Sequence, residues 1–195
     1  GRHGEYDFGS YKRGYFYAKS AGLLKPDSDL ILCNDSCFGP LNGFEDMMSR
    51  MTMESYDFWG ITESKKFRYH LQSYFLYFSS VVYGHPYFDE FMNGIKKHDS
   101  VQDVIKNYEL KLTDDLIKKG FRAKALIDAK SVESLPTEQR LNIEHFPRFM
   151  VENGSPLFKV KSLTKARCNL EGVNDTFHFL KARNKSLYGQ ILALP

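Results

Sequence analysis

The sequence predicts an α/β domain with a largely parallel sheet flanked by helices, followed by a mostly helical C-terminal appendage. Short apolar runs alternate with helical patterns through the first two-thirds of the chain, which is typical of α/β layers. The apolar run Leu30–Cys33 stops abruptly at Asn34-Asp35-Ser36, as buried strands do at the carboxyl edge of such a sheet. A polar stretch with Pro136 marks a change of character. We therefore predict an α/β domain over residues 1–130 and a basic, mostly helical appendage over residues 131–195.

Strands are expected where apolar, β-branched or aromatic residues run together between turn residues. These segments are residues 30–33, 56–62, 71–83 and 121–127. The first eight residues are polar and glycine-rich, and a helical pattern follows them. A nucleotide-binding sheet normally opens on a strand, so we expect its first strands to lie outside this sequence.

Helices are expected where apolar residues recur at helical spacing behind a capping residue. Ser10 and Ser100 are suitable caps, and Pro86 suits a first turn. Met47, Met48 and Met51 share one face of a helix, which predicts core packing. The predicted helices cover residues 10–24, 44–53, 86–95, 100–107 and 109–119, and in the appendage 143–152 and 175–183.

Composition and charge narrow the classes of function. The chain has 195 residues, of which 42% are hydrophobic and 15% aromatic, enough for a packed core. It has no apolar run of about 20 residues, and its three cysteines, Cys33, Cys37 and Cys168, predict reduced thiols in a cytoplasmic protein. A net charge of +3 is too small to indicate nucleic-acid binding. Residues 145–195 hold eight Lys or Arg against three acids, so this end either contacts anionic lipid at the inner face of a membrane or is a solvated helical surface.

Asp35 is the first candidate for chemistry. A carboxylate at the end of a buried strand, beside Asn34 and Ser36, can hold Mg²⁺ or Mn²⁺, which would neutralise a diphosphate leaving group. Alternatively, the side chain accepts a backbone N–H in an Asx-turn. Asp7 precedes Lys12 at the entry to the first helix, where it is either a helix-start acid or a contact for a nucleoside, with Lys12 reaching phosphate.

Glu109 is the candidate catalytic acid or base. It heads a predicted helix that leads back to a strand, from where a carboxylate can point into the mouth of the sheet and take a proton from an acceptor hydroxyl. Alternatively, it is a first-turn acid that faces water. His70, Gln72 and Ser73 bring polar groups into an apolar strand and suit hydrogen bonds to a sugar, although His70 alone fits a core histidine. Trp59 next to Gly60 suits stacking on a sugar ring or burial in the core.

Five motifs together resemble the rhamnan synthesis protein F family, bacterial glycosyltransferases of cell-wall and capsular polysaccharides. They are, in family order, Tyr6–Lys12, Leu32–Leu41, Asp57–Thr62, His70–Phe75 and Tyr108-Glu109, with a weaker likeness at Gly154–Lys159. The layout is also similar to family 2 glycosyltransferases with a GT-A (Rossmann-like) fold. By that analogy Asn34-Asp35-Ser36 stands at the metal-binding Asp-x-Asp motif and Glu109 at the catalytic base. Asn34 and Ser36 replace carboxylates, so one acid remains.

The resemblance implies an inverting transfer of a sugar, rhamnose in the family's name, from a nucleotide-diphosphate sugar to a growing lipid-linked glycan. Glu109 would be the general base, and Asp35 would steady the diphosphate with or without a divalent cation. Asp7, Lys12 and Asn34 would contact the donor, and Trp59, His70, Gln72 and Ser73 the sugars. A non-catalytic binding or scaffold module of the same shape is the alternative.

Overall fold

The computed structural model describes residues 5–41, 43–140, 142–163, 177–182 and 184–192. The chain divides into two compact units, and each unit combines two segments of the sequence. The first unit contains residues 1–34 and 55–125, and the second contains residues 35–54 and 126–195. Residues 35–54 thus group with the C-terminal part of the chain.

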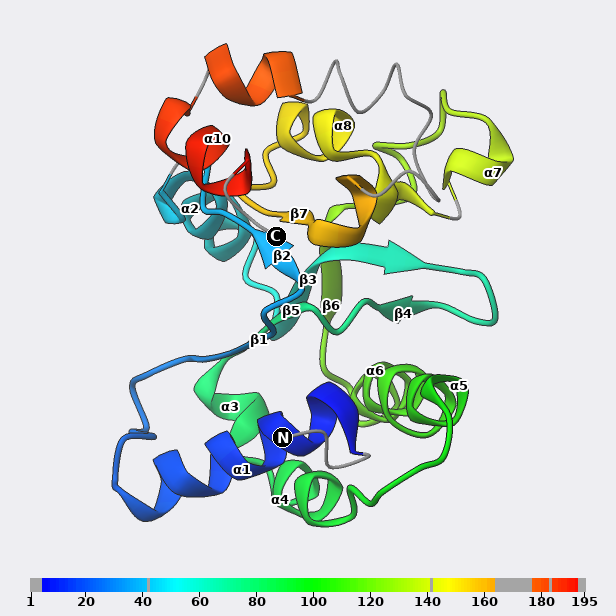
Figure 1. Ribbon diagram of the computed structural model, residues 1–195. Helices are drawn as coiled ribbons and strands as arrows, with labels where there is room; N and C mark the ends of the chain where they lie inside the picture. The colour runs from blue at the N-terminus through cyan, green and yellow to red at the C-terminus, as the bar shows by residue number, and fades with distance from the viewer. Residues whose placement is uncertain (1–4, 42, 141, 164–176, 183, 193–195) are drawn as a thin grey trace. The chain divides into compact units, whose positions relative to one another are not determined.

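A five-stranded sheet forms the centre of the first unit (Figure 1). Its strand order is β1-β5-β3-β4, and β6 pairs with β3. The last two residues of β6 belong to the second unit. The strands are β1 (Leu30–Cys33), β3 (Phe58–Ser64), β4 (His70–Leu71), β5 (Phe75–Phe78) and β6 (Ala123–Ile127).

The expectation of a largely parallel sheet is wrong. β5 pairs antiparallel with both β1 and β3, and β4 pairs antiparallel with β3. Residues 65–69 and 72–74 are the only connections from β3 to β4 and from β4 to β5, and parallel neighbours would need crossovers of a dozen residues or more. The N–H groups of Asp57 and Phe58 both donate to the carbonyl of Arg122, so β3 and β6 begin side by side and the sheet is mixed.

The run 71–83, expected as one strand, is divided into several elements. Gln72 and Ser73 lie between β4 and β5, and the chain then leaves the sheet for the short helix α3 (Ser80–Tyr83). Ser79 precedes that helix in an extended conformation. Aromatic and β-branched composition therefore identified strand-forming residues here but not the turns between them.

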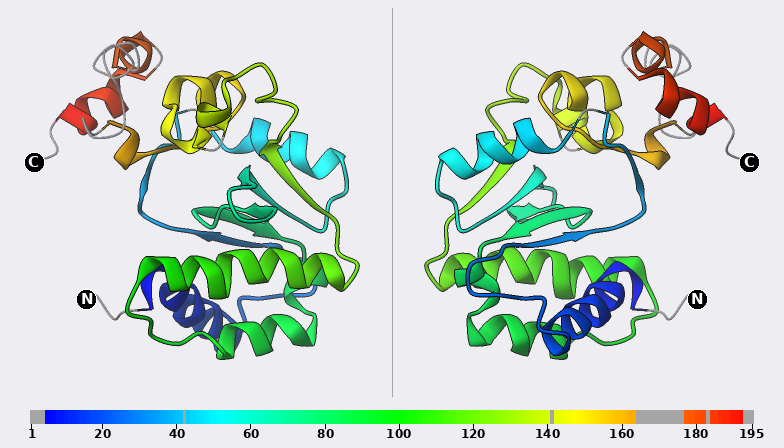
Figure 2. Two further views of the ribbon diagram at one scale, coloured as in Figure 1. Left: turned by 90° about the vertical axis from the view of Figure 1, so that its right-hand side faces the viewer. Right: turned by 90° about the vertical axis from the view of Figure 1, so that its left-hand side faces the viewer.

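Helices cover one face of this sheet (Figure 2). His85 caps the helix that begins at Pro86, since its Nδ1 accepts the N–H of Tyr87 at 3.1 Å. The predicted cap Ser100 is confirmed, since its hydroxyl accepts the N–H of Asp103 at 3.1 Å. A π-helical turn at residues 105–109 lies between the helix that Ser100 caps and the helix that begins at Leu110. The elements are α1 (Tyr6–Ser20), α4 (Pro86–Asn93), α5 (Val101–Val104), the π-helix η1 (Ile105–Glu109) and α6 (Leu110–Lys118).

α1 begins at Tyr6 and ends at Ser20, so it lies four residues ahead of the expected helix at both ends. Phe8, Tyr11 and Tyr15 recur at helical spacing and are buried. Their packing, rather than a cap at Ser10, determines where the helix starts, since tertiary contacts often override local signals.

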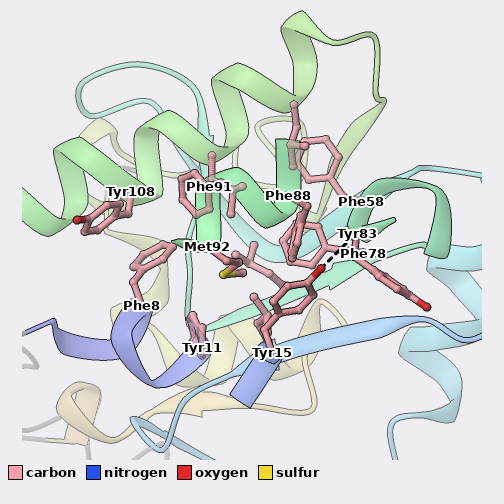
Figure 3. Packing of buried hydrophobic residues seen from close by; sticks show 14 of the residues in the cluster. Phe8, Tyr11, Tyr15, Phe58, Phe78, Tyr83, Phe88, Phe91, Met92 and Tyr108 are labelled. Carbon is pink, nitrogen blue, oxygen red and sulfur yellow. Dashed lines mark hydrogen bonds between the residues drawn. The ribbon is translucent and has the colours of Figure 1, made fainter. Parts of the chain in front are cut away.

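An aromatic cluster joins these helices to the sheet (Figure 3). The rings of Phe8 and Tyr108 lie 5.4 Å apart, and those of Phe78 and Phe88 lie 5.0 Å apart. Burial of each such side chain contributes about 1.5–3 kcal/mol to stability before conformational entropy is subtracted. This cluster fixes α1 and η1 against the strands that carry the candidate site.

The second unit is mostly helical but contains a strand pair. β2 and β7 are antiparallel, with Cys37 opposite Lys159, and Asn184 Nδ2 donates to the carbonyl of Leu41 at 2.9 Å. Residues 177–182 are also helical. The other elements are β2 (Cys37–Phe38), α2 (Glu45–Met53), α7 (Thr137–Arg140), the 3₁₀ turn η2 (Ile143–His145), α8 (Pro147–Glu152), β7 (Phe158–Lys159), the 3₁₀ turn η3 (Val160–Leu163) and α10 (Lys185–Leu192).

Several predictions for this unit are confirmed. α2 matches the expected helix, and Met47 and Met51 are buried; η2 and α8 together cover the helix expected at 143–152. The helix expected at 175–183 lies partly outside the described residues, and Cys168 lies outside them. No helix in the described part of the chain is both long enough and apolar enough to cross a membrane.

Candidate functional site

Glu109 lies at the end of a π-helical turn, directly before α6. π-Helical turns are rare and often occur at functional sites, because the extra residue per turn changes where side chains point. Tyr108 is held beside it, because its hydroxyl accepts the N–H of Lys96 at 2.7 Å and its ring packs on Phe8. The backbone that presents Glu109 is thus fixed by the aromatic cluster.

The carboxylate of Glu109 is bound on both oxygens. Oε2 accepts the backbone N–H of Ser73 at 2.9 Å and the Ser73 hydroxyl at 2.5 Å. Oε1 lies 3.3 Å from Nε2 of His70. The side chains of His70 and Glu109 are only 4% and 14% exposed. The structure therefore brings together three of the residues selected from the sequence, His70, Ser73 and Glu109.

His70 faces two acceptors. Its Nδ1 lies 2.8 Å from the carbonyl oxygen of Arg68, and a carbonyl oxygen only accepts, so we assign a proton to Nδ1. Its Nε2 faces the Glu109 carboxylate, which also only accepts when ionised. The geometry therefore favours an imidazolium–carboxylate pair, since the contact is attractive when Nε2 also carries a proton.

These contacts decide the charge of Glu109. Burial opposes ionisation of the carboxyl, but the hydrogen bonds from His70 and Ser73 outweigh burial and lower the pKa of Glu109 below its usual value. At neutral pH Glu109 is a largely buried, oriented anion. An anion in that setting can either receive a proton from a bound hydroxyl or serve as a structural ion pair.

Further hydrogen bonds hold residues 72–74, the segment that carries Ser73. Gln72, a predicted sugar contact, accepts the hydroxyl of Thr62 at 2.6 Å, and the Thr62 oxygen lies 2.9 Å from the hydroxyl of Tyr74. Tyr11 donates to the carbonyl of Ser73 at 2.7 Å. The short segment between β4 and β5 is therefore held on several sides.

The sequence interpretation did not select Tyr11, Thr62, Tyr74 or Thr113 as site residues. Thr113 accepts the N–H of Leu71 at 3.1 Å and is buried. It lies four residues after Glu109, on the same face of the helix, so helical spacing alone could have pointed to it. Tyr11 and Thr62 lie within two of the five family motifs, but spacing does not relate them to residues 72–74, because only the folded chain brings them there.

The predicted donor contacts Asp7 and Asn34 meet in the structure. Nδ2 of Asn34 donates to Oδ2 of Asp7 at 2.8 Å near the surface. Lys12 lies elsewhere on α1, where its ammonium donates to the carbonyls of Asn93 and Ile95 at 3.1 and 2.9 Å. Lys12 therefore stabilises the C-terminal end of α4.

Asp35 is exposed in the turn after β1 and belongs to the second unit. The described residues contain no group of three His, Cys, Asp or Glu side chains suited to a metal ion. Mg²⁺ is commonly held by one or two carboxylates together with substrate phosphates. Cation binding at Asp35 therefore stays a prediction.

Trp59 is 1% exposed. Its ring stacks on Tyr77 at 5.0 Å and lies 5.7 Å from Phe75, and its buried Nε1 has no hydrogen-bond partner among the described residues. Gly60 gives room to the neighbouring strand, since a Cβ there would lie 3.2 Å from the carbonyl oxygen of Phe75. This arrangement offers no exposed indole face for a sugar.

The family model for rhamnan synthesis protein F matches residues 2–185, nearly the whole chain. The chain belongs to the rhamnan synthesis protein F family. The family resemblance expected from the five motifs is thus confirmed. The Glu109 cluster is formed by two of those motifs, His70–Phe75 and Tyr108-Glu109.

Two relatives of this family member are longer than the region that they share with it. It is 30% identical over 144 residues to virulence protein VirA of Vibrio anguillarum, and the aligned region covers 73% of this chain and 46% of VirA. It is 31% identical over 125 residues to the uncharacterized protein y4gN of Sinorhizobium fredii, covering 62% of this chain and 32% of y4gN. The chain thus spans less than half the length of these relatives. No solved structure matches it.

Proposed function

We propose that this chain contributes the acceptor-activating part of a glycosyltransferase that moves a sugar, rhamnose by the family's name, from a nucleotide-diphosphate sugar to a growing glycan. The observation that carries the proposal is the ionised, oriented Glu109 carboxylate between His70 and Ser73. A general base must be held in position and deprotonated before the acceptor arrives, and both conditions are met here. The lipid-linked acceptor is part of the same proposal.

In the proposed reaction an acceptor hydroxyl replaces the Ser73 hydroxyl at Oε2 of Glu109. The acceptor proton passes to Glu109 as the hydroxyl oxygen bonds to the anomeric carbon, and the bond from that carbon to the diphosphate oxygen breaks. The Ser73 N–H and His70 stay in place and keep the carboxylate oriented. Attack from the face opposite the diphosphate gives inversion.

Contacts of the donor are proposed at Asp7 and Asn34, which already form a pair at the surface. Asp35, alone or with Mg²⁺ or Mn²⁺ bound jointly by the diphosphate, would steady the leaving group. Calorimetric binding of dTDP, UDP and GDP, with and without Mn²⁺, tests these contacts. If Mn²⁺ strengthens nucleotide binding by the parent, and Asp35→Ala removes this gain but leaves binding without Mn²⁺ unchanged, the result would support a cation at Asp35.

Glu109→Gln tests the role of the base. The amide has nearly the same shape but cannot take the acceptor proton, so we expect turnover of the sugar donor to fall about 10²- to 10⁴-fold. Ser73→Ala should keep turnover within about tenfold, because the acceptor replaces that hydroxyl. Glu90→Gln, an exposed carboxylate on α4, is the matched control. Turnover of Glu109→Gln within tenfold of the parent would rule out the base.

The second candidate function is a non-catalytic module that binds a glycan or a partner in polysaccharide assembly. The same cluster supports it, because a carboxylate with both oxygens bound and a lowered pKa is also typical of a structural ion pair. Under this alternative the parent chain neither transfers sugar nor hydrolyses the donor, and Glu109→Gln changes stability alone.

A further inference from the structure

A depression of about 320 Å³ lies beside the Glu109 helix but opens on the surface. The loop between β3 and β4 forms one wall, and η1 with the start of α6 forms the other; both lie in the first unit. The lining residues are Phe67, Arg68, Lys106, Asn107, Leu110 and Lys111. None of them contributes to the hydrogen bonds of the Glu109 carboxylate.

The depression has an apolar part. Phe67 is 62% exposed although it is a large aromatic residue, and the stretch Lys65-Lys66-Phe67-Arg68 places it between cationic residues. Leu110 is buried beneath the surface and completes the apolar lining. An exposed aromatic ring among cations is typical of surfaces that enter a lipid interface.

The rim of the depression is cationic. Lys106 and Lys111 are exposed on its helical wall. Arg68 contributes a third positive charge, and its guanidinium lies 3.3 Å from Asp114. Asp114 also accepts from Lys118 at 2.7 Å, so this one carboxylate is shared by two cations. The rim therefore keeps an excess of positive charge that would attract a phosphate group.

We propose that this depression binds a phosphorylated lipid. The hydrocarbon next to the phosphate would lie against Phe67 and Leu110, and the phosphate would bind Lys106 and Lys111, with Arg68 beside them. Such a ligand is either the headgroup of an anionic membrane phospholipid or an isoprenyl phosphate. The site requires no sugar transfer, so it does not depend on the role proposed for Glu109.

Flotation of the protein with lipid vesicles tests the site. Three compositions are compared: phosphatidylcholine alone, phosphatidylcholine with phosphatidylglycerol, and phosphatidylcholine with a small fraction of a long-chain isoprenyl monophosphate. We expect binding to the two anionic compositions only, weakened by added salt. The double variant Lys106→Glu/Lys111→Glu should reduce partitioning at least about 20-fold, since each basic residue near an anionic surface strengthens binding about fivefold.

Phe67→Ser tests the apolar part separately and should weaken binding several-fold. Matched controls are Lys96→Glu/Lys97→Glu, two exposed lysines after α4, and Tyr17→Ser, an aromatic that is 70% exposed on α1. These controls should bind like the parent. All altered side chains are exposed, and circular dichroism checks that each variant is folded.

The outcomes separate the two ligands and can overturn the site. Binding to the isoprenyl phosphate at a mole fraction where phosphatidylglycerol gives none assigns an isoprenyl phosphate, whereas equal binding at equal charge assigns a phospholipid headgroup. Absence of binding to both anionic compositions overturns the proposal. An equal loss in Lys96→Glu/Lys97→Glu also overturns it, because binding would then follow overall charge.

Discussion

Glu109 in the first unit and Asp35 in the second are both carboxylates near the end of a regular element, yet their surroundings differ completely. Glu109 is only 14% exposed and accepts hydrogen bonds from the Ser73 backbone and hydroxyl, with His70 at its other oxygen. Asp35 is exposed in a turn. The same functional group is therefore oriented by the protein at one position and left to solvent at the other.

This difference separates two ways in which a carboxylate can serve a site. A buried anion is organised before any ligand arrives, but its desolvation must be compensated by donors within the protein. An exposed anion needs no such compensation and gains a defined geometry only from a ligand, such as a cation with a bound diphosphate. Stability should accordingly depend strongly on Glu109 and weakly on Asp35.

The largest expected effect is the loss of stability on removing the carboxylate of Glu109, compared with removing that of Asp35. Glu109→Ala leaves His70 and the Ser73 donors without their acceptor, so we expect the free energy of unfolding to fall by about 3–5 kcal/mol. Asp35→Ala should change it by no more than about 0.5 kcal/mol. Urea unfolding followed by circular dichroism measures both. Similar losses in the two variants would contradict the contrast drawn between the two positions.

The next effect concerns pH. Because the pKa of Glu109 is lowered in the folded protein, its ionised form stabilises the fold above the ordinary pKa of a glutamate. That stabilisation is lost as the pH falls through the folded pKa. Glu109→Gln keeps most of the shape but lacks the charge, so its stability should lie about 1–2 kcal/mol below the parent at pH 7. The gap should narrow below about pH 4.5.

Unfolding of the parent and of Glu109→Gln is compared in one buffer series, so that other acids with lowered pKa values, Asp89 and Asp114, contribute equally to both. Only the difference between the two proteins is interpreted. A gap that stays the same from pH 7 to pH 3.5 would show that the charge of Glu109 does not stabilise the fold.

The helices, strands and site residues that depend on neighbouring residues in the sequence could be predicted. α4 follows from His85 and Pro86, whose capping and fixed backbone act within one turn. β1 and the apolar face of α2 follow from short patterns in the same way. His70 and Ser73 were selected as site residues because a polar side chain within an apolar segment is a local signal as well, and Glu109 was selected because it heads a predicted helix.

What depends on distant residues was not predicted. The antiparallel pairing of β1 with β5 joins segments more than 40 residues apart, and β2 with β7 joins residues 37–38 to residues 158–159. The π-helical turn that ends at Glu109 likewise could not be predicted from amino-acid composition. It brings Tyr108 against Phe8 and Phe91 and directs Glu109 to Ser73, contacts that exist only after the chain has folded.

The smallest expected effect on stability is at the pair formed by Asp7 and Asn34. Both lie near the surface, and one hydrogen bond of 2.8 Å joins them, so each alanine substitution should lower the free energy of unfolding by about 0.5 kcal/mol or less. If the pair contacts the donor as proposed, nucleotide binding should nevertheless weaken about tenfold in each variant, because a ligand hydrogen bond to a charged group is lost. Calorimetry measures this on folded protein, with Asp27→Ala, another exposed acid of the same unit, as the control.

Unchanged nucleotide binding in both variants would leave the pair as surface structure, and the donor contacts would then have to lie on other residues. Weakened binding with intact stability would show that the exposed site can be changed without cost to the fold, the opposite of what is expected at Glu109.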